Sequence, residues 1–342
     1  MPEGKRGGSL YQPTKCHAGE VRFLVYGAGA IGGVVGAKLF QAGYDVTLVA
    51  RGAHLDGIRQ RGLRLESPDG VETLPIPVID SGSLGEVVAP AVVLLAVKSQ
   101  DTASAVRDLA GTGLAEAVVC LQNGVDNERV ALRSFGDVYG ACVMCPAAHL
   151  EPGIVTAHAS PVTGILDLGR YPAGIDERAA EIADALTPAT FMSQPRVDIM
   201  RWKYRKLVMN LGNAVQALCG QVHEGDVILE LIKQEAQSCF EAAGIDVVTV
   251  EEDRERRADH IQRLPVPGRP RSGGSSYQSL ERRQGSIETD YLNGEICLLG
   301  RMYGVPTPAN VAVQRLANRA AAEHWEPGRM TATELLGTIA QD

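Results

Sequence analysis

The first half of the chain alternates short apolar runs with helical or turn-forming segments. Apolar runs cover residues 21–26, 45–50, 91–97, 117–122 and 138–144. Runs of this kind, separated by helical stretches, are typical of a mainly parallel sheet whose two faces are both covered by helices. Two later runs, residues 154–158 and 163–168, follow the Pro152-Gly153 turn, and we expect them to form antiparallel strands.

From about residue 197 onward, apolar residues recur at intervals of three and four, which is the period of a helix. We expect helices over residues 199–218, 227–243, 279–303 and 308–323. Thr307 and Pro308 suit the N-cap and the first turn of the last helix. Between these helices, residues 264–276 are rich in Pro, Gly and Ser, a composition typical of a mobile linker.

A glycine-rich loop follows the first apolar run directly. It consists of Gly27, Ala28, Gly29, Ala30, Ile31 and Gly32, and it leads into a helical segment and a second strand. This arrangement is typical of a dinucleotide-binding turn, in which the first glycine permits the tight turn and the second lets the backbone approach a pyrophosphate. The third glycine lets the helix pack on the strand, and the helix N-terminus attracts phosphate. We therefore expect all six residues to contact a cofactor.

The end of the second strand indicates which nucleotide is bound. An NAD site usually has an acidic residue there, which accepts hydrogen bonds from the ribose hydroxyls. This chain has Ala50-Arg51-Gly52 instead. A guanidinium can hold a 2′-phosphate by charge-assisted hydrogen bonds, so Arg51 favours NADP (NADPH), although a plain surface arginine is the alternative.

These patterns together predict an α/β fold of two domains. Residues 21–196 are expected to form an N-terminal Rossmann-type doubly wound sheet that binds NADP. Residues 197–336 are expected to form an all-helical C-terminal domain that carries the substrate and catalytic groups. Residues 1–20, which are polar and rich in Gly and Lys, are expected to be a disordered tail, and residues 337–342 a short tail.

The composition excludes some classes of partner and indicates the cellular compartment. The net charge of −8 argues against nucleic acid as a partner. No apolar run approaches the roughly 20 residues of a membrane span, and no signal segment is present, so we expect no membrane partner. Seven cysteines, an odd number scattered through apolar segments, indicate a reducing cytoplasm. Cys142 and Cys145 are interpreted as buried thiols, the histidines lack metal-ligand spacing, and no metal is expected. Whether the protein forms a homodimer is left open by the sequence.

Polar side chains follow two of the predicted strands. Lys98-Ser99-Gln100 comes after residues 91–97, and Gln122-Asn123-Gly124 ends the run that starts at residue 117. Ligands of an open α/β sheet lie beyond the carboxyl ends of its strands. We therefore expect Lys98, Gln100 and Asn123 to reach the cofactor, and Lys98 also the substrate. A solvated lysine and an ordinary Asn-Gly turn are the alternatives.

A polar stripe runs along the predicted helix over residues 199–218. Lys206, Asn210 and Asn213 fall within about 60° of one another at 100° per residue. The opposite side is apolar, so the helix is expected to be buried nearly all round, and such a stripe usually lines a cleft. A solvated face is the alternative.

These motifs, taken in this order, resemble the ketopantoate reductase family (2-dehydropantoate 2-reductases) over nearly all of residues 21–323. The matching pieces are GAGAIG, the strand end at Arg51, VKSQD, LQNGV, WKYRKLVMN, SSYQSLERRQGSIETDYLNG and GVPTPAN. The resemblance implies that NADPH and substrate lie in the cleft between a Rossmann domain and a helical domain. It also implies a catalytic Lys at Lys206 with Glu288 as its partner, a substrate-orienting Asn at Asn123, and a carboxylate-binding Ser at Ser276.

The resemblance implies NADPH-dependent reduction of a 2-oxo acid to a 2-hydroxy acid, with 2-dehydropantoate or a related branched molecule as substrate. The chain departs from the family pattern where Ala214 replaces a helix Asn, with Asn213 one residue earlier, and where Ser272 and glycines precede the serine pair. We therefore expect fewer contacts to the pantoate hydroxyls than the family pattern provides, unless Asn213 takes the place of the missing Asn. Two alternatives are a dehydrogenase of a 3-hydroxy acid or another carbonyl substrate, and a non-catalytic NADP-binding protein.

Overall fold

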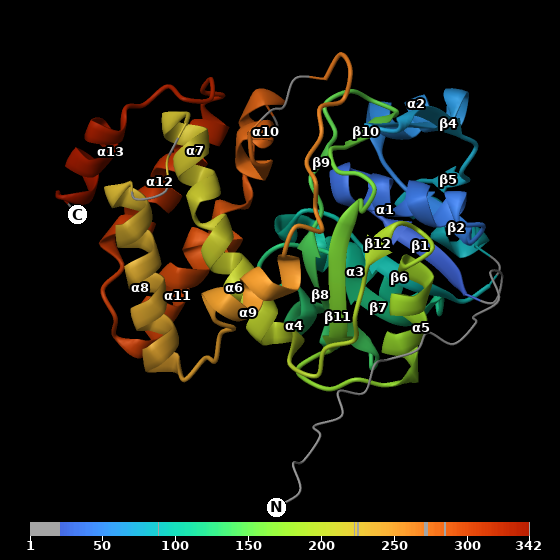
Figure 1. The fold of residues 1–342 in the computed structure, drawn as a ribbon, viewed down its shortest axis with the longest axis horizontal. Coiled ribbons are helices and arrows are strands. Elements are labelled where there is room, and N and C mark those ends of the chain that lie inside the picture. The colour runs from blue at the N-terminus through green and yellow to red at the C-terminus, as the bar shows by residue number, and fades with distance from the viewer. Residues whose placement is uncertain are drawn as a thin grey trace, which may run out of the picture.

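The computed structural model describes residues 21–87, 89–221, 223, 226–269, 273–283 and 285–341. The predicted N-terminal tail, residues 1–20, lies outside the described residues. Figure 1 shows two lobes, one built around β-sheets from the first half of the chain and one built of helices from the second half. The predicted fold class is confirmed: a Rossmann-type sheet domain is followed by a helical domain.

The main sheet has eight strands in the order β12-β11-β8-β7-β6-β1-β2-β5. Its strands are β1 (Arg22–Tyr26), β2 (Asp45–Val49), β5 (Val78–Ile79), β6 (Ala91–Leu95), β7 (Ala115–Cys120), β8 (Val138–Met144), β11 (Gly164–Arg170) and β12 (Phe191–Met192). The five predicted parallel strands are confirmed as β1, β2, β6, β7 and β8, and β11 runs antiparallel to β8 as expected. The chain leaves β1 toward β2 and returns to its other side as β6, so a ligand crevice is expected at the carboxyl end of β1.

Helices cover both faces of this sheet, because successive strand residues point to opposite sides. Phe23 and Val25 of β1 belong to one core, and Leu24 and Tyr26 belong to the other. The first core includes side chains of α1 (Ala30–Gln41), α2 (Gly52–Arg61) and α5 (Glu177–Leu186), and the second those of α3 (Thr102–Ala110) and α4 (Asn127–Leu132). Short 3₁₀ turns precede β6 and α3: η1 (Ser81–Glu86) and η2 (Ser99–Asp101).

A second sheet, which the sequence pattern did not predict, lies against α1. It has the order β4-β3-β10-β9, with β3 (Leu63–Ser67), β4 (Gly70–Leu74), β9 (Ala147–Ala148) and β10 (Ile154–Ala157). The expectation for residues 154–158 was only half right, because β10 is antiparallel to β9 but parallel to β3. A Cβ on Gly33 of α1 would lie 2.6 Å from Val155, so a glycine is needed where this sheet approaches the helix.

The helical domain contains more elements than the four predicted helices. They are α6 (Ile199–Asn210), α7 (Gly212–Cys219), α8 (Val227–Ala243), α9 (Val250–Arg257), α10 (Ser275–Glu281), η3 (Glu288–Tyr291), α11 (Asn293–Tyr303), α12 (Pro308–Ala322) and α13 (Ala332–Ile339). The expected helix over 227–243 is found with those bounds. The expected tail at 337–342 was wrong in part, because α13 continues to Ile339.

Two predicted helices are interrupted for identifiable reasons. The helix expected over 199–218 breaks at Leu211, where the side chain of Asn293 donates to the Leu211 carbonyl at 3.3 Å. The helix expected over 279–303 was only partly right. Its end is α11 and its start belongs to α10, but Arg283 and Gly285 adopt left-handed φ angles of 51° and 72° and end the helical run between them.

Thr307 is the N-cap of α12 as expected, but its side chain accepts no capping hydrogen bond. The Glu235 carboxylate of α8 caps the helix instead, accepting from the backbone N–H groups of Ala309 at 2.7 Å and Asn310 at 2.9 Å. A carboxylate at this position also interacts favourably with the helix dipole. The cap is thus supplied by a neighbouring helix, which the local sequence does not show.

The segment after α9 crosses back to the sheet domain. Leu264 N–H donates to the His158 carbonyl at 3.0 Å, and Ser160 N–H donates to the Gln262 carbonyl at 3.3 Å. Arg269 is paired with Glu66 and Glu151. The mobile linker expected over 264–276 is therefore fixed to the sheet domain over residues 264–269, while residues 270–272 lie outside the described residues.

Candidate active site

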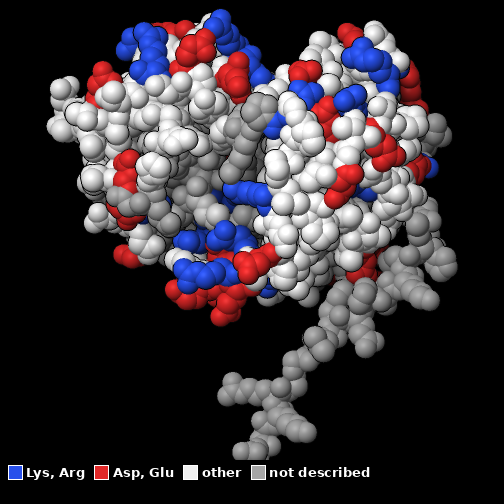
Figure 2. Space-filling model, turned by 45° about the horizontal axis from the view of Figure 1, so that its top comes forward, with Lys and Arg blue, Asp and Glu red and all other residues white. Residues whose placement is uncertain are grey.

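A cavity of about 1790 Å³ lies at the carboxyl ends of β1, β6, β7 and β8, between the sheet and helices α6, α7 and α10. The hollow between the two lobes is visible in Figure 2, where blue Lys and Arg side chains gather at its floor and edges. Its cationic lining residues are Arg51, Lys98, Lys206, Arg257, Arg263, Arg269 and Arg282. A cavity of this size and charge suits a large anionic ligand together with a small one.

The glycine loop forms one wall of the cavity. Gly27 has a φ of 106°, and a Cβ there would come within 2.8 Å of the Val97 backbone nitrogen. A Cβ on Gly29 would meet nothing within 4 Å, so its absence leaves open space above the start of α1. Residues 27–31 border the cavity, whereas Gly32 lies beneath the loop, where a Cβ would lie 2.1 Å from the Gly27 carbonyl oxygen. The first turn of α1 contains no acidic residue. This cradle fits a pyrophosphate.

Arg51 borders the cavity at the N-cap of α2, and its side chain is 87% exposed. Its Nη2 donates to Asp101 Oδ2 at 3.0 Å. A second carboxylate is held nearby, since the Tyr26 hydroxyl donates to Asp108 at 2.6 Å. Two carboxylates, from η2 and α3, therefore border the cavity together with Arg51, although none follows β2 directly.

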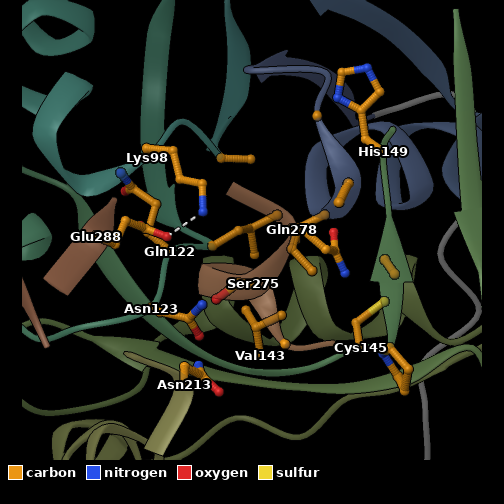
Figure 3. A pocket seen from close by; sticks show the side chains of 18 of the residues that line it. Lys98, Gln122, Asn123, Val143, Cys145, His149, Asn213, Ser275, Gln278 and Glu288 are labelled. Carbon is orange, nitrogen blue, oxygen red and sulfur yellow. Dashed lines mark hydrogen bonds and ion pairs between the residues drawn. The ribbon is translucent and has the colours of Figure 1, made fainter. Parts of the chain in front are cut away.

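Glu288 is paired with Lys98, and not with Lys206 as the sequence implied. Lys98 Nζ donates to Glu288 Oε2 at 2.6 Å, as Figure 3 shows, while the Ser99 N–H and hydroxyl donate to Oε1 at 3.1 and 3.2 Å. The cause is topological, because η3 places the Glu288 carboxylate over the turn that follows β6. Gln100 is a second correction: it donates to Ser286 and does not border the cavity.

Asn123 borders the cavity at the end of β7. Its backbone carbonyl accepts a hydrogen bond from Asn127 Nδ2 at 2.9 Å, and it lies 3.3 Å from the Ser99 hydroxyl, which shares its single proton between this carbonyl and Glu288. Gly124 follows with a φ of 80°, which turns the chain away sharply. The loop is therefore held through its backbone, and the Asn123 amide is left to serve a ligand.

Lys206, Asn210 and Asn213 all border the cavity, although they come from two helices and not from one. Burial lowers the pKa of the Lys206 ammonium, and the guanidinium groups of Arg263 and Arg257 act in the same direction. Asn210 is buried, and its Nδ2 has no hydrogen-bond partner. Such an orphaned donor beside a cavity indicates a ligand that completes its hydrogen bond.

Ser276 does not border the cavity, and its neighbour Ser275 does. Ser276 is 2% exposed, and its hydroxyl has no partner. The reason is that α10 begins at Ser275, and successive helical residues point about 100° apart. Gln216 of α7 holds the start of α10 by accepting from Gly274 N–H at 2.8 Å.

Several residues that border the cavity were not singled out from the sequence. His54 Nε2 lies 2.7 Å from the Ala28 carbonyl, and the Gly153 N–H donates to His54 Nδ1, so the ring braces the glycine loop. The His54 ring also contacts the His149 ring, with centroids 4.1 Å apart and planes tilted by 48°. The His149 carbonyl accepts from Arg282 at 2.6 Å. No spacing signal marks these residues, because they come together from four separate elements.

Within the residues that the structure describes, no cluster of three or more His, Cys, Asp or Glu residues is arranged to hold a metal ion. No helix of the described chain is both long and apolar enough to cross a membrane.

Family models, related sequences and solved structures all match this chain to ketopantoate reductases or to proteins of the same fold. Residues 23–172 match the family model described as ketopantoate reductase PanE/ApbA, and residues 198–321 match that of its C-terminal part. The 2-dehydropantoate 2-reductase of Mesorhizobium japonicum is 30% identical over 335 residues, which cover 89% of this chain and 98% of that protein. A PanE/ApbA family ketopantoate reductase structure from Ralstonia eutropha is 26% identical, with a TM-score of 0.74 and coverage of 89% and 99%. D-mandelate dehydrogenase, solved with NADH and anilino(oxo)acetate, shares the fold at 22% identity, with a TM-score of 0.77 and coverage of 90% and 100%.

Proposed function

Because this chain belongs to the ketopantoate reductase family, we propose that it reduces a 2-oxo acid to the 2-hydroxy acid with NADPH. The observation that carries this proposal is the convergence of a pyrophosphate cradle, a lysine of lowered pKa and the Asn123 amide on one cavity. A non-catalytic NADP-binding protein has no need to keep a proton donor there.

The bound nicotinamide supplies the hydride that reduces the carbonyl carbon. The carbonyl oxygen then gains negative charge, and it needs a hydrogen-bond donor and a proton. Asn123 donates a hydrogen bond to this oxygen, and Lys206 transfers a proton to it and is reprotonated from solvent. The lowered pKa of Lys206 suits this transfer, because a general acid works best when its pKa is near the working pH.

The Lys98–Glu288 pair also borders the cavity. Glu288 keeps Lys98 oriented through an ion pair whose carboxylate is buried. Ser275 and the Arg282 guanidinium, which both border the cavity on α10 and its C-cap, suit the carboxylate of a 2-oxo acid. The orphaned Asn210 Nδ2 is a further donor for that substrate.

Apolar side chains of β8, α6 and the segment after α9 also border the cavity. They are Val143, Met144, Met209, Ile261, Leu264 and Pro265, and we propose that they form an apolar wall against the substrate. An apolar wall separates substrates that differ by a methylene only weakly, whereas a site that reads hydroxyls discriminates strongly. We therefore propose comparable activity on several branched 2-oxo acids, with ketopantoate as one of them.

For the cofactor, we propose that Arg51 binds the 2′-phosphate of NADPH. Its exposed guanidinium at the end of β2 supports this role, while its ion pair with Asp101 opposes it. D-mandelate dehydrogenase, which shares the fold, was solved with NADH. Both cofactors therefore belong in every assay.

The test is oxidation of NADPH or NADH by the full-length protein with a panel of 2-oxo acids that includes ketopantoate and its analogue without the hydroxyl. We expect turnover with several branched members and a preference for NADPH. Lys206→Met is expected to lower kcat about 100-fold or more, the usual effect of losing a positioned acid, with nearly unchanged NADPH affinity. No turnover with any 2-oxo acid, or a Lys206→Met variant as active as the parent, would contradict the proposal.

A further inference from the structure

A buried ion pair joins the two domains directly behind the active site. Lys203 of α6 donates to Glu128 of α4 and, at 3.1 Å, to the backbone carbonyl of Gln122. The side chains of Lys203 and Glu128 are only 2% and 0% exposed. Lysine side chains are rarely buried, because burying the charged ammonium is costly. Here the lysine of a helix in one domain is buried in the core of the other domain and donates to a backbone carbonyl there.

The surrounding chain is built to admit this lysine. Gly140 of β8 lies beside it, and a Cβ there would come within 3.2 Å of Lys203 Cδ and 3.3 Å of Glu128 Oε1. Even so, Glu128 Oε2 and Gln122 Oε1 have no hydrogen-bond partner. Two buried polar atoms thus lack hydrogen bonds, so this ion pair is not the most stable way to fill the space. A contribution to stability alone therefore does not explain why the ion pair is present.

Lys203 and Gln122, the two residues joined by this hydrogen bond, each lie close in sequence to a residue of the proposed mechanism. Lys203 lies one turn before Lys206 on the same helix. Gln122 immediately precedes Asn123, whose own carbonyl is held by Asn127 and Ser99. Lys203 thus fixes one carbonyl of this loop from the helical domain, while the sheet domain fixes the next.

We propose that Lys203 is a positioning residue that sets the distance between the helix carrying Lys206 and the loop carrying Asn123. The proposal rests on the proposed function, because it assigns both groups to one substrate oxygen. A displacement of about 1 Å between groups that act on the same atom can lower the rate on the order of 100-fold. Cofactor contacts of the glycine loop lie elsewhere and are not affected.

The decisive variant replaces both charges, Lys203→Met with Glu128→Leu. Apolar residues of similar size at a buried ion pair usually leave stability unchanged or raise it. The Gln122 carbonyl loses the Lys203 donor, which costs stability, so this protein is expected to fold with a modestly lower melting temperature. We expect its dissociation constant for NADPH to stay close to the parent value. We expect kcat to fall about 10- to 100-fold, and the kinetic isotope effect with 4-deuterated NADPH to rise as the chemical step becomes limiting.

Two further variants separate positioning from simple packing. Glu128→Gln leaves the Lys203 ammonium buried without its counter-charge, so it should markedly lower the free energy of unfolding. It keeps the Lys203 hydrogen bond to the Gln122 carbonyl, so the folded variant should retain kcat within about threefold. Arg256→Met removes another buried ion pair between the domains, while Asp167 keeps its bond to Arg196. It should leave kcat within about twofold of the parent value.

A folded double variant with parental kcat and isotope effect overturns this inference and leaves the proposed function standing. If the double variant does not fold, Glu128→Gln decides, and a loss of more than tenfold in its kcat overturns the inference. A parent protein that reduces no 2-oxo acid overturns the proposed function and this inference with it.

Discussion

Glu295 is expected to make the stability of this protein depend on pH near neutrality. It lies half-buried in the first turn of α11, and burial raises the pKa of its carboxyl from an ordinary value of 4.5 to about 7, with the Asp126 carboxylate acting in the same direction and Arg129 against it. Between these two pH values the folded state holds a proton that the unfolded state has released. The stabilisation is therefore complete below pH 4.5 and is lost as the pH rises through 7.

The size of the effect follows from the same two pKa values. At about 1.4 kcal/mol per pKa unit, the difference between 4.5 and about 7 corresponds to an upper limit of about 3.5 kcal/mol. Solvent screening of a half-buried carboxyl reduces the expected effect to about 1–2 kcal/mol. Glu295→Gln, which keeps the shape and cannot ionise, should therefore match the parent near pH 4.5 and exceed its stability by about 1–2 kcal/mol at pH 8.

The assay is urea denaturation of both proteins at half-unit intervals between pH 4.5 and 8, because other groups titrate in this range and only the difference isolates Glu295. Glu230→Gln, which removes a carboxylate whose side chain is 63% exposed from the first turn of another helix, is the matched control. A parent–variant difference for Glu295→Gln that does not grow between pH 5 and 8, or that grows no more than the difference for Glu230→Gln, would refute the reasoning.

Three further predictions test the site and the fold. Arg51→Glu should weaken NADPH binding about tenfold or more, the loss expected for a charge-assisted pair, with little change for NADH; fluorescence titration measures both, and equal parental affinities for the two cofactors contradict the role of Arg51. Ser275→Ala should raise KM for every active 2-oxo acid more than Ser276→Ala does, since only Ser275 borders the cavity; steady-state kinetics decides, and the reverse order restores the family assignment. Gly33→Ala should destabilise the protein by about 1–3 kcal/mol through the clash with Val155, and an unchanged melting temperature would show that the second sheet moves freely away from α1.

The parts of the fold that the sequence predicted are those fixed by local chemistry. The run from β1 through the glycine loop into α1 is determined within about twenty residues by backbone conformation and side-chain size, as Gly27 and Gly29 show. The parallel strands are also local, because each is buried on both faces and is therefore continuously apolar. The second sheet was missed because β3 and β4 are partly exposed and β9 has two residues, so none produces a clear period.

The errors within the site share a different cause, since each depends on where an element starts or on which distant element lies opposite. The motif spacing placed Ser276 in the site, but the first residue of α10 decides that Ser275 faces the cavity. Resemblance paired Glu288 with Lys206, but η3 lies over the turn after β6 and brings the carboxylate to Lys98. The polar stripe predicted on α6 was correct although α6 ends at Asn210. Asn293 donates to the Leu211 carbonyl, but Leu211 itself keeps helical φ and ψ angles. Asn213 on α7 therefore still faces the same cavity as Lys206. Predictions from residue spacing along one helix were therefore more accurate than predictions of which residues pair between elements. A helix fixes the relative directions of its side chains, whereas pairing depends on the packing of the whole domain.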